Sequence, residues 1–477
     1  MNRDLPREPL GERRRDLLLD LSAALAGALL VTAAALVGTA IERRAHTLYV
    51  RWPPVFAQWE PHVGLGTPAA LVVAVAVVAY GPPLAARLPW RVLLWAAWGT
   101  ATAWTFSLAL VDGWQRGIAG RLTTTNEYLR VIDRFHDIPV ALRDFTHHIV
   151  SHSPAPWPAH IAGHPPAATL TFVLLDRIGL GGGGWAGVWC ITVGATAPVA
   201  VLVAVRVLAR EGREDGERRE GGEVLARRAA PFLVLAPAAV WVGTSADGYF
   251  AAVAAWAVAF LALAVTGHRP RATGLASGLL LGLTAYLSYG LTLFVVIAGA
   301  VLLLGSHRLR PLPYLLAGLA VVPVVFTLAG FNWWEAYRLL VTRYYEGIGG
   351  TRPYGYWVWA NLACTVLIVG PATVAGLRRA GTAVGTAVAV APLRKGLRGF
   401  SRTAAPETHL ALLVLAALLA LLVADLSGMS KAETERIWLP FAMWLLSACA
   451  FLPRPRGWLA AQATLALLLN HLLLTGW

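Results

Sequence analysis

Charged residues are scarce in this chain: of its 477 residues only 14% are Asp, Glu, Lys or Arg, whereas 57% are hydrophobic. Soluble domains carry about a quarter charged residues, so the composition excludes an ordinary soluble protein. The charges form short clusters between apolar runs of about 17 residues or more, which is the length of a helix across the hydrocarbon core. Because backbone groups in lipid must be hydrogen-bonded internally, these runs are expected to be α-helices.

Cysteine is also rare. Cys190, Cys364 and Cys449 lie in or beside apolar runs without metal-ligand spacing, so no disulfide framework is expected. The net charge of +14 has the magnitude of a nucleic-acid-binding protein. However, the basic residues lie between apolar runs, where they set topology and meet anionic headgroups. Membrane lipids are therefore expected partners, and nucleic acid is not.

The apolar runs predict an all-α polytopic membrane protein with about thirteen spans: 17–41, 66–84, 90–112, 184–206, 229–245, 248–266, 272–288, 289–305, 312–330, 354–376, 408–425, 437–452 and 457–475. The first run is too long for a signal peptide and is expected to remain as a span. Arg13, Arg14 and Arg15 precede it, which places the N-terminus in the cytoplasm. With this orientation, the segments predicted inside hold 26 of the 40 Lys and Arg residues.

Four segments predicted outside are rich in Trp, Tyr, His and Pro: 42–65, 113–183, 331–353 and 426–436. Loops held by a rigid scaffold commonly carry function. We therefore divide the chain into N-terminal transmembrane helices (1–112), an extracytoplasmic loop with juxtamembrane helices (113–183) and the remaining bundle (184–477), which includes the outer loops 331–353 and 426–436.

Two sets of apolar residues in 113–183 each share one helix face: Tyr128, Ile132 and Phe135, and, after the helix break at Pro139, Leu142, Phe145 and Ile149. Such helices, flanked by arginines, are expected to lie in the membrane interface with the apolar side toward lipid. A site bounded by them suits a substrate with a lipid tail and a polar head.

Three outer acids are candidates for chemistry, and each has a plainer interpretation. Glu127 follows a Thr-rich run of N-cap candidates, so it is either a catalytic acid or a glutamate that complements a helix dipole. Asp112 is either catalytic or a charge at the membrane edge. Asp247 either binds substrate or is an ordinary turn aspartate.

Histidines cluster between positions 147 and 164. His164 precedes two prolines, which favour extended backbone and fix the direction of its imidazole. The spacings of His148 with His152 and of His160 with His164 would suit zinc on a helix. Prolines at 154, 156 and 158 oppose a helix across the second pair, so no residue is assigned to a metal.

Arginines and aromatic residues occur together in the later outer segments: Arg343, Arg352, Arg436, Trp334, Tyr345 and Tyr354. These residues are either an aromatic belt with snorkelling arginines or a site in which guanidinium groups bind phosphate and rings stack on sugar.

In their order along the chain, Asn126-Glu127-Tyr128 and His164-Pro165-Pro166 resemble the acidic motif and the Pro-Pro motif of the GT-C superfamily of membrane glycosyltransferases. The usual acidic pair is here a single acid, and the motif follows the third span instead of the first. The resemblance is greatest to compact methylthioxylose or arabinan-type enzymes of the cell envelope of GC-rich Gram-positive bacteria.

The resemblance implies an inverting transferase in the bacterial plasma membrane, with its active site outside, a polyprenyl-phosphate sugar as donor and an envelope glycan or glycolipid as acceptor. Glu127 or Asp112 would be the general base, and Arg343, Arg352 and Arg436 would bind the donor phosphate. The substrate would be bound by Tyr128, His164, Asp247, Trp334, Tyr345 and Tyr354. The resemblance establishes no cofactor; a divalent metal between phosphate and acid is compatible with this chemistry, although a single carboxylate gives it few ligands.

Two other classes stay open. A transporter or flippase for a lipid-linked envelope precursor predicts charged residues inside the spans, whereas the charges here stop at the span edges. A non-catalytic scaffold would use the aromatic loops as docking surfaces.

Overall fold

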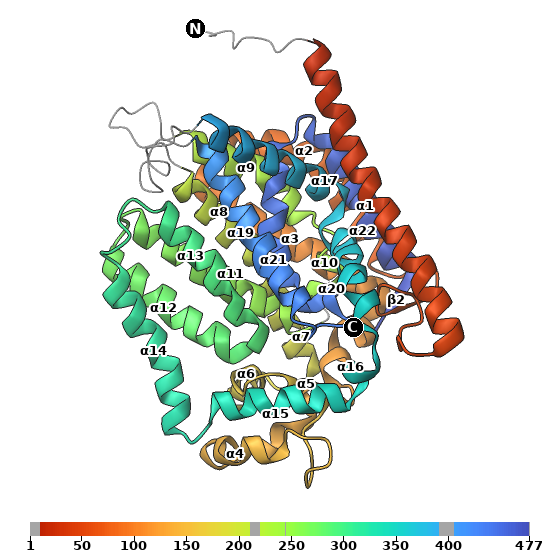
Figure 1. Ribbon diagram of the computed structural model, residues 1–477, viewed down its shortest axis with the longest axis vertical. Helices are drawn as coiled ribbons and strands as arrows, with labels where there is room; N and C mark the ends of the chain where they lie inside the picture. Colours follow the sequence, from red (N-terminus) through yellow and green to blue (C-terminus); the bar gives the residue numbers. More distant parts are fainter. Residues whose placement is uncertain (1–9, 210–219, 244, 391–404, 477) are drawn as a thin grey trace.

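The computed structural model describes residues 10–209, 220–243, 245–390 and 405–476, and nearly all of its secondary structure is helical (Figure 1). The longer helices are α1 (Leu10–Ala45), α2 (Thr67–Arg87), α3 (Trp90–Ala109), α7 (Gly183–Gly194), α8 (Ala197–Leu208), α9 (Glu220–Val234), α11 (Asp247–Val265), α12 (Pro270–Leu287), α13 (Phe294–Leu304), α14 (Leu312–Leu328), α15 (Trp333–Glu346), α17 (Tyr354–Val390), α19 (Pro406–Leu426) and α22 (Pro455–Leu472). The shorter helices are α4 (Ile138–Asp144), α5 (Ala159–Gly163), α6 (Ala167–Arg177), α10 (Ala239–Val242), α16 (Ile348–Thr351), α20 (Thr434–Ile437) and α21 (Leu439–Leu445), with 3₁₀ turns that include η4 (Tyr128–Phe135) and η5 (Phe145–His148).

Six helical segments in the described part of the chain are long and apolar enough to cross a membrane: Arg14–Ala45, Thr67–Arg87, Gly183–Leu208, Asp247–Val265, Tyr354–Ala389 and Pro406–Leu426. The helices α14 and α15 meet at 76° and count as a seventh span if they are taken together. This supports a membrane protein. Each of the thirteen predicted runs overlaps a helix, but the number of spans stays a prediction.

One predicted run ends differently. The run 457–475 was expected to be helical throughout, but α22 stops at Leu472 and residues Leu473–Thr475 form strand β2, which pairs antiparallel with β1 (Ala57–Trp59). Pairing with the N-terminal loop satisfies the backbone groups at the end of the chain. The fold is therefore almost, but not completely, all-α.

A kink in α17 shows how the sequence shapes the bundle. Gly370 has φ +76°, and a Cβ there would lie 1.7 Å from Oε1 of Gln462, so only glycine fits. Pro371 follows and lacks the N–H that would continue the helix. Beyond the kink, Arg378 and Arg379 both pair at 2.7 Å with the buried carboxylate of Asp20 on α1, which fastens α1 to α17.

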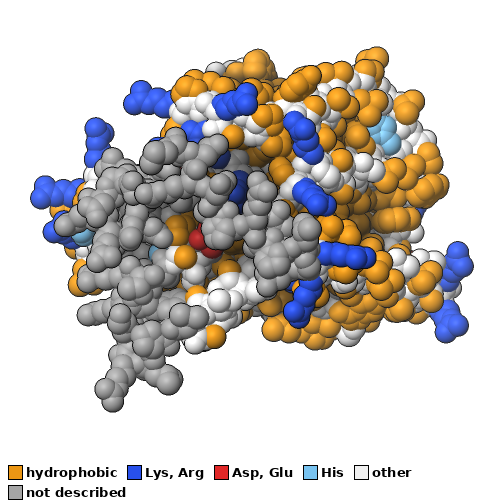
Figure 2. All heavy atoms as spheres, turned by 90° about the horizontal axis from the view of Figure 1, so that it is seen from above, with side chains coloured by type: hydrophobic (Ala, Val, Ile, Leu, Met, Phe, Trp, Pro, Cys, Tyr) orange, Lys and Arg blue, Asp and Glu red, His pale blue; other side chains and the backbone are white. Residues whose placement is uncertain are grey.

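The two ends of the bundle differ. The lower end in Figure 1 is formed by helices from the predicted outer segments, among them α4, α5, α6, α15 and α16. The opposite end, at which α1 begins, displays many Lys and Arg side chains and few acids (Figure 2). The segments that sequence analysis singled out thus share one end of the molecule.

The apolar faces in 113–183 pack against protein instead of pointing toward lipid. Phe135, Leu142, Phe145 and Ile149 are all buried, and the ring centroid of Phe145 lies 5.3 Å from that of Trp157. Aromatic pairs of this kind contribute about 0.5–1.5 kcal/mol beyond area burial. The expectation that these faces enter the membrane interface was wrong for them, because a protein surface already covers them.

Candidate functional site

A buried network of ionised and polar side chains lies where four separate segments meet. Glu127 precedes η4, His160 lies on α5, Asp247 is the first residue of α11, and Arg436 lies on α20. The exposed fractions of Glu127, Asp247 and Arg436 are only 4%, 4% and 5%. Charges that are buried to this degree require paired partners, and these residues supply them to one another.

His160 links Glu127 to Arg436. Its Nδ1 lies 2.8 Å from Oε1 of Glu127, and its Nε2 lies 3.0 Å from Nη2 of Arg436. A guanidinium group only donates hydrogen bonds, so Nε2 of His160 accepts and its proton is on Nδ1. The imidazole therefore donates to the Glu127 carboxylate through Nδ1.

Arg436 is the centre of the network. Its Nη1 donates to Oδ2 of Asp247 at 2.9 Å and its Nη2 donates to Oε2 of Glu433 at 2.9 Å. Burial lowers the pKa of Arg436, but Asp247, Glu433 and Glu127 raise the pKa by more, so the net shift is upward. Asp247 lies in the first turn of α11, where the helix dipole also stabilises a carboxylate.

Glu433 joins two of the predicted phosphate-binding arginines. Its Oε2 contacts Arg436, and its Oε1 lies 3.6 Å from Nη1 of Arg352. Burial raises the pKa of Glu433, but the guanidinium groups of Arg436 and Arg352 lower it by more. Arg352 is held in place through donation to the carbonyl oxygens of Leu48 at 2.9 Å and Lys431 at 2.7 Å.

His164 and Tyr128 border the network. The backbone at His164 is extended, with φ −129° and ψ 149°, as its position before two prolines predicted. Its Nδ1 donates to the carbonyl oxygen of His160 at 2.7 Å, and burial lowers the pKa of His164 to about 4. The ring centroid of Tyr128 lies 5.9 Å from that of His164 and 6.3 Å from that of His160, so Tyr128 packs against both imidazoles.

Asp112, the alternative base, belongs to a different cluster at the same end. Its carboxylate contacts Nε2 of His62 at 2.7 Å, Nη2 of Arg121 at 3.3 Å and Nε of Arg116 at 3.8 Å. The other nitrogen of His62 lies 2.7 Å from the carbonyl oxygen of Glu60. Both ring nitrogens of His62 thus face acceptor oxygens. Asp112 is surrounded by two guanidinium groups and one imidazole.

Arg121 lies between the two acids. It pairs with Asp112, and the negative charges of Asp112 and Glu127 both act on its guanidinium group. Burial, aided by Arg116, nevertheless lowers the pKa of Arg121 to about 10. The clusters around Glu127 and Asp112 therefore influence each other electrostatically through Arg121.

Four predicted residues lie outside both clusters. Arg343 donates to the carbonyl oxygen of Ile149. Trp334, Tyr345 and Tyr354 are 70%, 47% and 42% exposed, and the Tyr354 hydroxyl donates to Leu426. Among the described residues none of these four contacts the Glu127–Arg436 network, so they are suited at most to the approach of a substrate.

Sequence reasoning did not include two residues that complete the network. His160 was considered only as half of a zinc pair, and no role was predicted for Glu433. Within the described residues no group of three or more His, Cys, Asp and Glu side chains is arranged to hold a metal. His160 lies four residues before His164, on the short helix α5 that ends just before the Pro-Pro motif. This position is the feature of the sequence that could have indicated His160.

The chemistry of the two acids differs. The direct side-chain partner of Glu127 is the imidazole of His160, whereas Asp112 contacts two guanidinium groups as well as an imidazole.

The chain was compared with protein-family models, curated proteins and solved structures, and nothing matches in any of the three.

Proposed function

We propose that the protein is an inverting glycosyltransferase with GT-C-like architecture and about thirteen spans. It transfers a sugar from a polyprenyl-phosphate donor to a cell-envelope glycan or glycolipid acceptor. The reaction takes place at the extracytoplasmic face of a bacterial plasma membrane. The observation that carries this proposal is the meeting of Glu127, His160 and the Arg436–Glu433–Arg352 group in one buried network.

Glu127 is the general base. Its carboxylate takes the proton of the acceptor hydroxyl as that oxygen attacks the anomeric carbon, and the bond to the phosphate oxygen breaks on the opposite face with inversion. His160 holds the carboxylate at 2.8 Å through Nδ1–H and is itself oriented by Arg436. This ordering lowers the reorganisation that the transition state requires.

Arg352 and Arg436 stabilise the leaving phosphate. At present the two oxygens of Glu433 contact these two arginines. A carboxylate that bridges two guanidinium groups occupies the place that a phosphate group would take, so the donor phosphate displaces Glu433.

The position of the network supports the proposal. It lies at the end of the bundle opposite the Lys- and Arg-rich face (Figures 1 and 2), and positive charge gathers on the cytoplasmic side of membrane proteins. A site at the outer end, at the level of the membrane surface, meets both a lipid-linked phosphate and a polymeric acceptor.

The test uses membranes that contain the full chain and a panel of radiolabelled polyprenyl-phosphate sugars. Wild-type membranes should transfer label to an endogenous envelope glycan or glycolipid, and Glu127→Gln should not, because Gln keeps the hydrogen bond to His160 but accepts no proton. Asp133→Asn is the matched control, since Asp133 is an exposed acid in the same segment. Full transfer by Glu127→Gln, or lipid translocation without transfer, would refute the proposal.

A further inference from the structure

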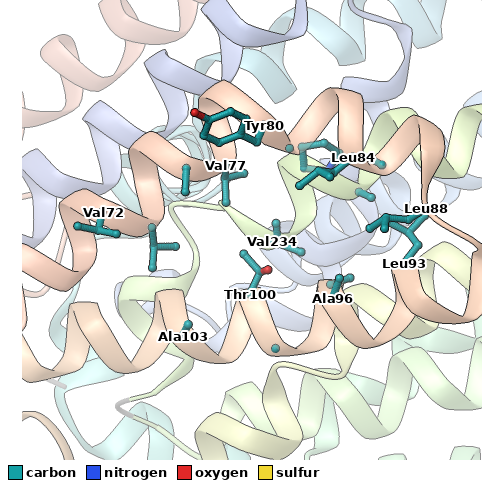
Figure 3. A pocket seen from close by; sticks show the side chains of 18 residues that line it. Val72, Val77, Tyr80, Leu84, Leu88, Leu93, Ala96, Thr100, Ala103 and Val234 are labelled. Carbon is teal, nitrogen blue, oxygen red and sulfur yellow. The ribbon is translucent and has the colours of Figure 1, made fainter.

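A second feature lies toward the opposite end of the molecule. An apolar groove of about 450 Å³ runs between α2 and α3, with α9 behind it (Figure 3), and its volume is in the range of roughly 300–1,000 Å³ that is typical of ligand pockets. None of its lining residues is charged. Val72, Tyr80 and Leu84 on its rim are 68%, 64% and 51% exposed, so the groove opens sideways, toward the lipid if α2 spans the membrane.

Small residues on α3 create the space. Ala96, Thr100 and Ala103 face the larger side chains of α2 across the groove in Figure 3, and a Cβ added to Gly99 would meet nothing within 4 Å. Between Leu93 and Ala103, at about 1.5 Å per residue, the wall is roughly 15 Å long. This is about half of the roughly 30 Å hydrocarbon core, the depth of one lipid leaflet.

The groove is held open by contacts at both ends. Near Asp112 the backbone of Gly66 packs against α3, where a Cβ would lie 2.1 Å from the carbonyl oxygen of Ser107. At the other end Arg227 of α9 donates to the carbonyl oxygens of Ala85 and Leu88, at 2.7 and 2.8 Å. These bonds fix the α2–α3 turn, so the cavity does not depend on a ligand for its shape.

The charge at this end indicates the kind of occupant. Arg87 ends α2 and Arg91 lies in the first turn of α3; both are exposed, and neither has an acidic partner among the described residues. Neither helix contains an acid. Guanidinium groups at the membrane surface attract the phosphates of anionic lipids.

We propose that this groove is a binding site for an anionic phospholipid of the adjacent leaflet, with one hydrocarbon chain between α2 and α3 and the phosphate on Arg87 and Arg91. The site is distinct from the Glu127–Arg436 network, which lies at the other end of the bundle, and it does not depend on the proposed transferase activity.

The experiment reconstitutes the full chain in nanodiscs of phosphatidylcholine with a trace of phosphatidylglycerol that carries a mid-chain diazirine. After irradiation, mass spectrometry should locate the crosslinks on α2 and α3, and unlabelled phosphatidylglycerol should compete better than added phosphatidylcholine. Gly99→Leu should fill the groove and lower the crosslink yield there several-fold, whereas Gly457→Leu, at an equally open glycine of α22, should leave it unchanged.

A double variant tests the headgroup separately. Arg87→Gln with Arg91→Gln should lower the preference for phosphatidylglycerol by roughly thirtyfold, since each of the two basic residues at the surface contributes about 1 kcal/mol, while Arg456→Gln on α22 should not. Crosslinks on α2 and α3 no more frequent than on the exposed helix α14, or equal competition by the two lipids, would overturn the proposal. The experiment with Arg87→Gln and Arg91→Gln tests the proposal even if Gly99→Leu does not fold.

Discussion

The end of the molecule at which the predicted outer segments gather contains two pairs of an acid and a histidine that look alike in isolation. Glu127 with His160 and Asp112 with His62 have nearly equal separations of 2.8 and 2.7 Å. The second nitrogen of each ring distinguishes them. In His160 it faces a donor, the guanidinium of Arg436, and in His62 it faces an acceptor, the carbonyl oxygen of Glu60.

This difference determines what each acid can do. His160 donates to Glu127 and accepts from Arg436, so in the described part of the chain no guanidinium group contacts the Glu127 carboxylate directly. Arg116 and Arg121 both contact the Asp112 carboxylate, together with His62, so guanidinium groups already occupy the surroundings of that acid. An acid with a histidine neighbour is therefore not by itself a catalytic pair; the partner of the histidine decides.

The largest expected effect follows from the two acids. Glu127→Gln should lower sugar transfer on the order of 10³-fold, within the range of about 10²–10⁴ for a general base. Asp112→Asn should lower it less than about tenfold, through misplacement of Arg121, and should instead reduce thermal stability, because it leaves the guanidinium groups of Arg116 and Arg121 without their counter-charge. Initial rates and melting temperatures of both variants provide the measurement. Equal losses of rate would remove the distinction between the clusters.

A smaller effect is expected at the arginines. Arg352→Lys and Arg436→Lys keep the charge but lose the planar fork that binds two oxygens. The KM for the donor should rise about tenfold, while the KM for the acceptor should change little. Arg116→Lys, in the Asp112 cluster, is the control and should leave both KM values alone. If donor and acceptor KM rise together, these arginines anchor the fold and do not select the phosphate.

Substitution of Glu433, which bridges Arg352 and Arg436, should strengthen the binding of phosphate instead of weakening it. Glu433→Gln removes the negative charge that competes with the donor phosphate, so polyprenyl phosphate, the released product, should inhibit several-fold more strongly. Glu346→Gln, at an exposed acid of α15, should leave the inhibition constant unchanged. Weaker inhibition in Glu433→Gln would mean that the glutamate positions the arginines and is not displaced.

Sequence patterns predicted the helices and much of the network, but not its connections. Apolar runs located the helices because their length is set by the membrane, and Glu127, Asp247, Arg352 and Arg436 were all chosen from outer segments. The contacts of Arg436 with Asp247 and with His160 join positions that are 189 and 276 residues apart. Local spacing carries no information about such pairs.

The absence of long-range information in local spacing also explains why His160 was not predicted as part of the network and why some predicted residues lie away from it. His160 was judged on a zinc spacing, whereas its role follows from Arg436 on a distant segment. Trp334, Tyr345 and Tyr354 fit a sugar site by residue type but are exposed away from the network. Residue type predicts what chemistry a side chain can perform, and only the fold decides where.

The last expected effect concerns the dependence of stability on pH and distinguishes His164 from an exposed histidine. Its folded-state pKa of about 4 lies below the ordinary value of about 6.5. Above pH 6.5 the residue is neutral in both states and has no effect. Between pH 6.5 and 4 the unfolded chain binds a proton that the folded chain does not, so stability falls as pH falls. At pH 5 the loss is roughly 2 kcal/mol.

His164→Gln should therefore lose less thermal stability than the wild type between pH 7.5 and pH 5, whereas His136→Gln, at an exposed histidine, should behave as the wild type. Identical acid sensitivity in all three proteins would mean that His164 is protonated in the fold, and the charge assignment around Arg436 would have to be revised.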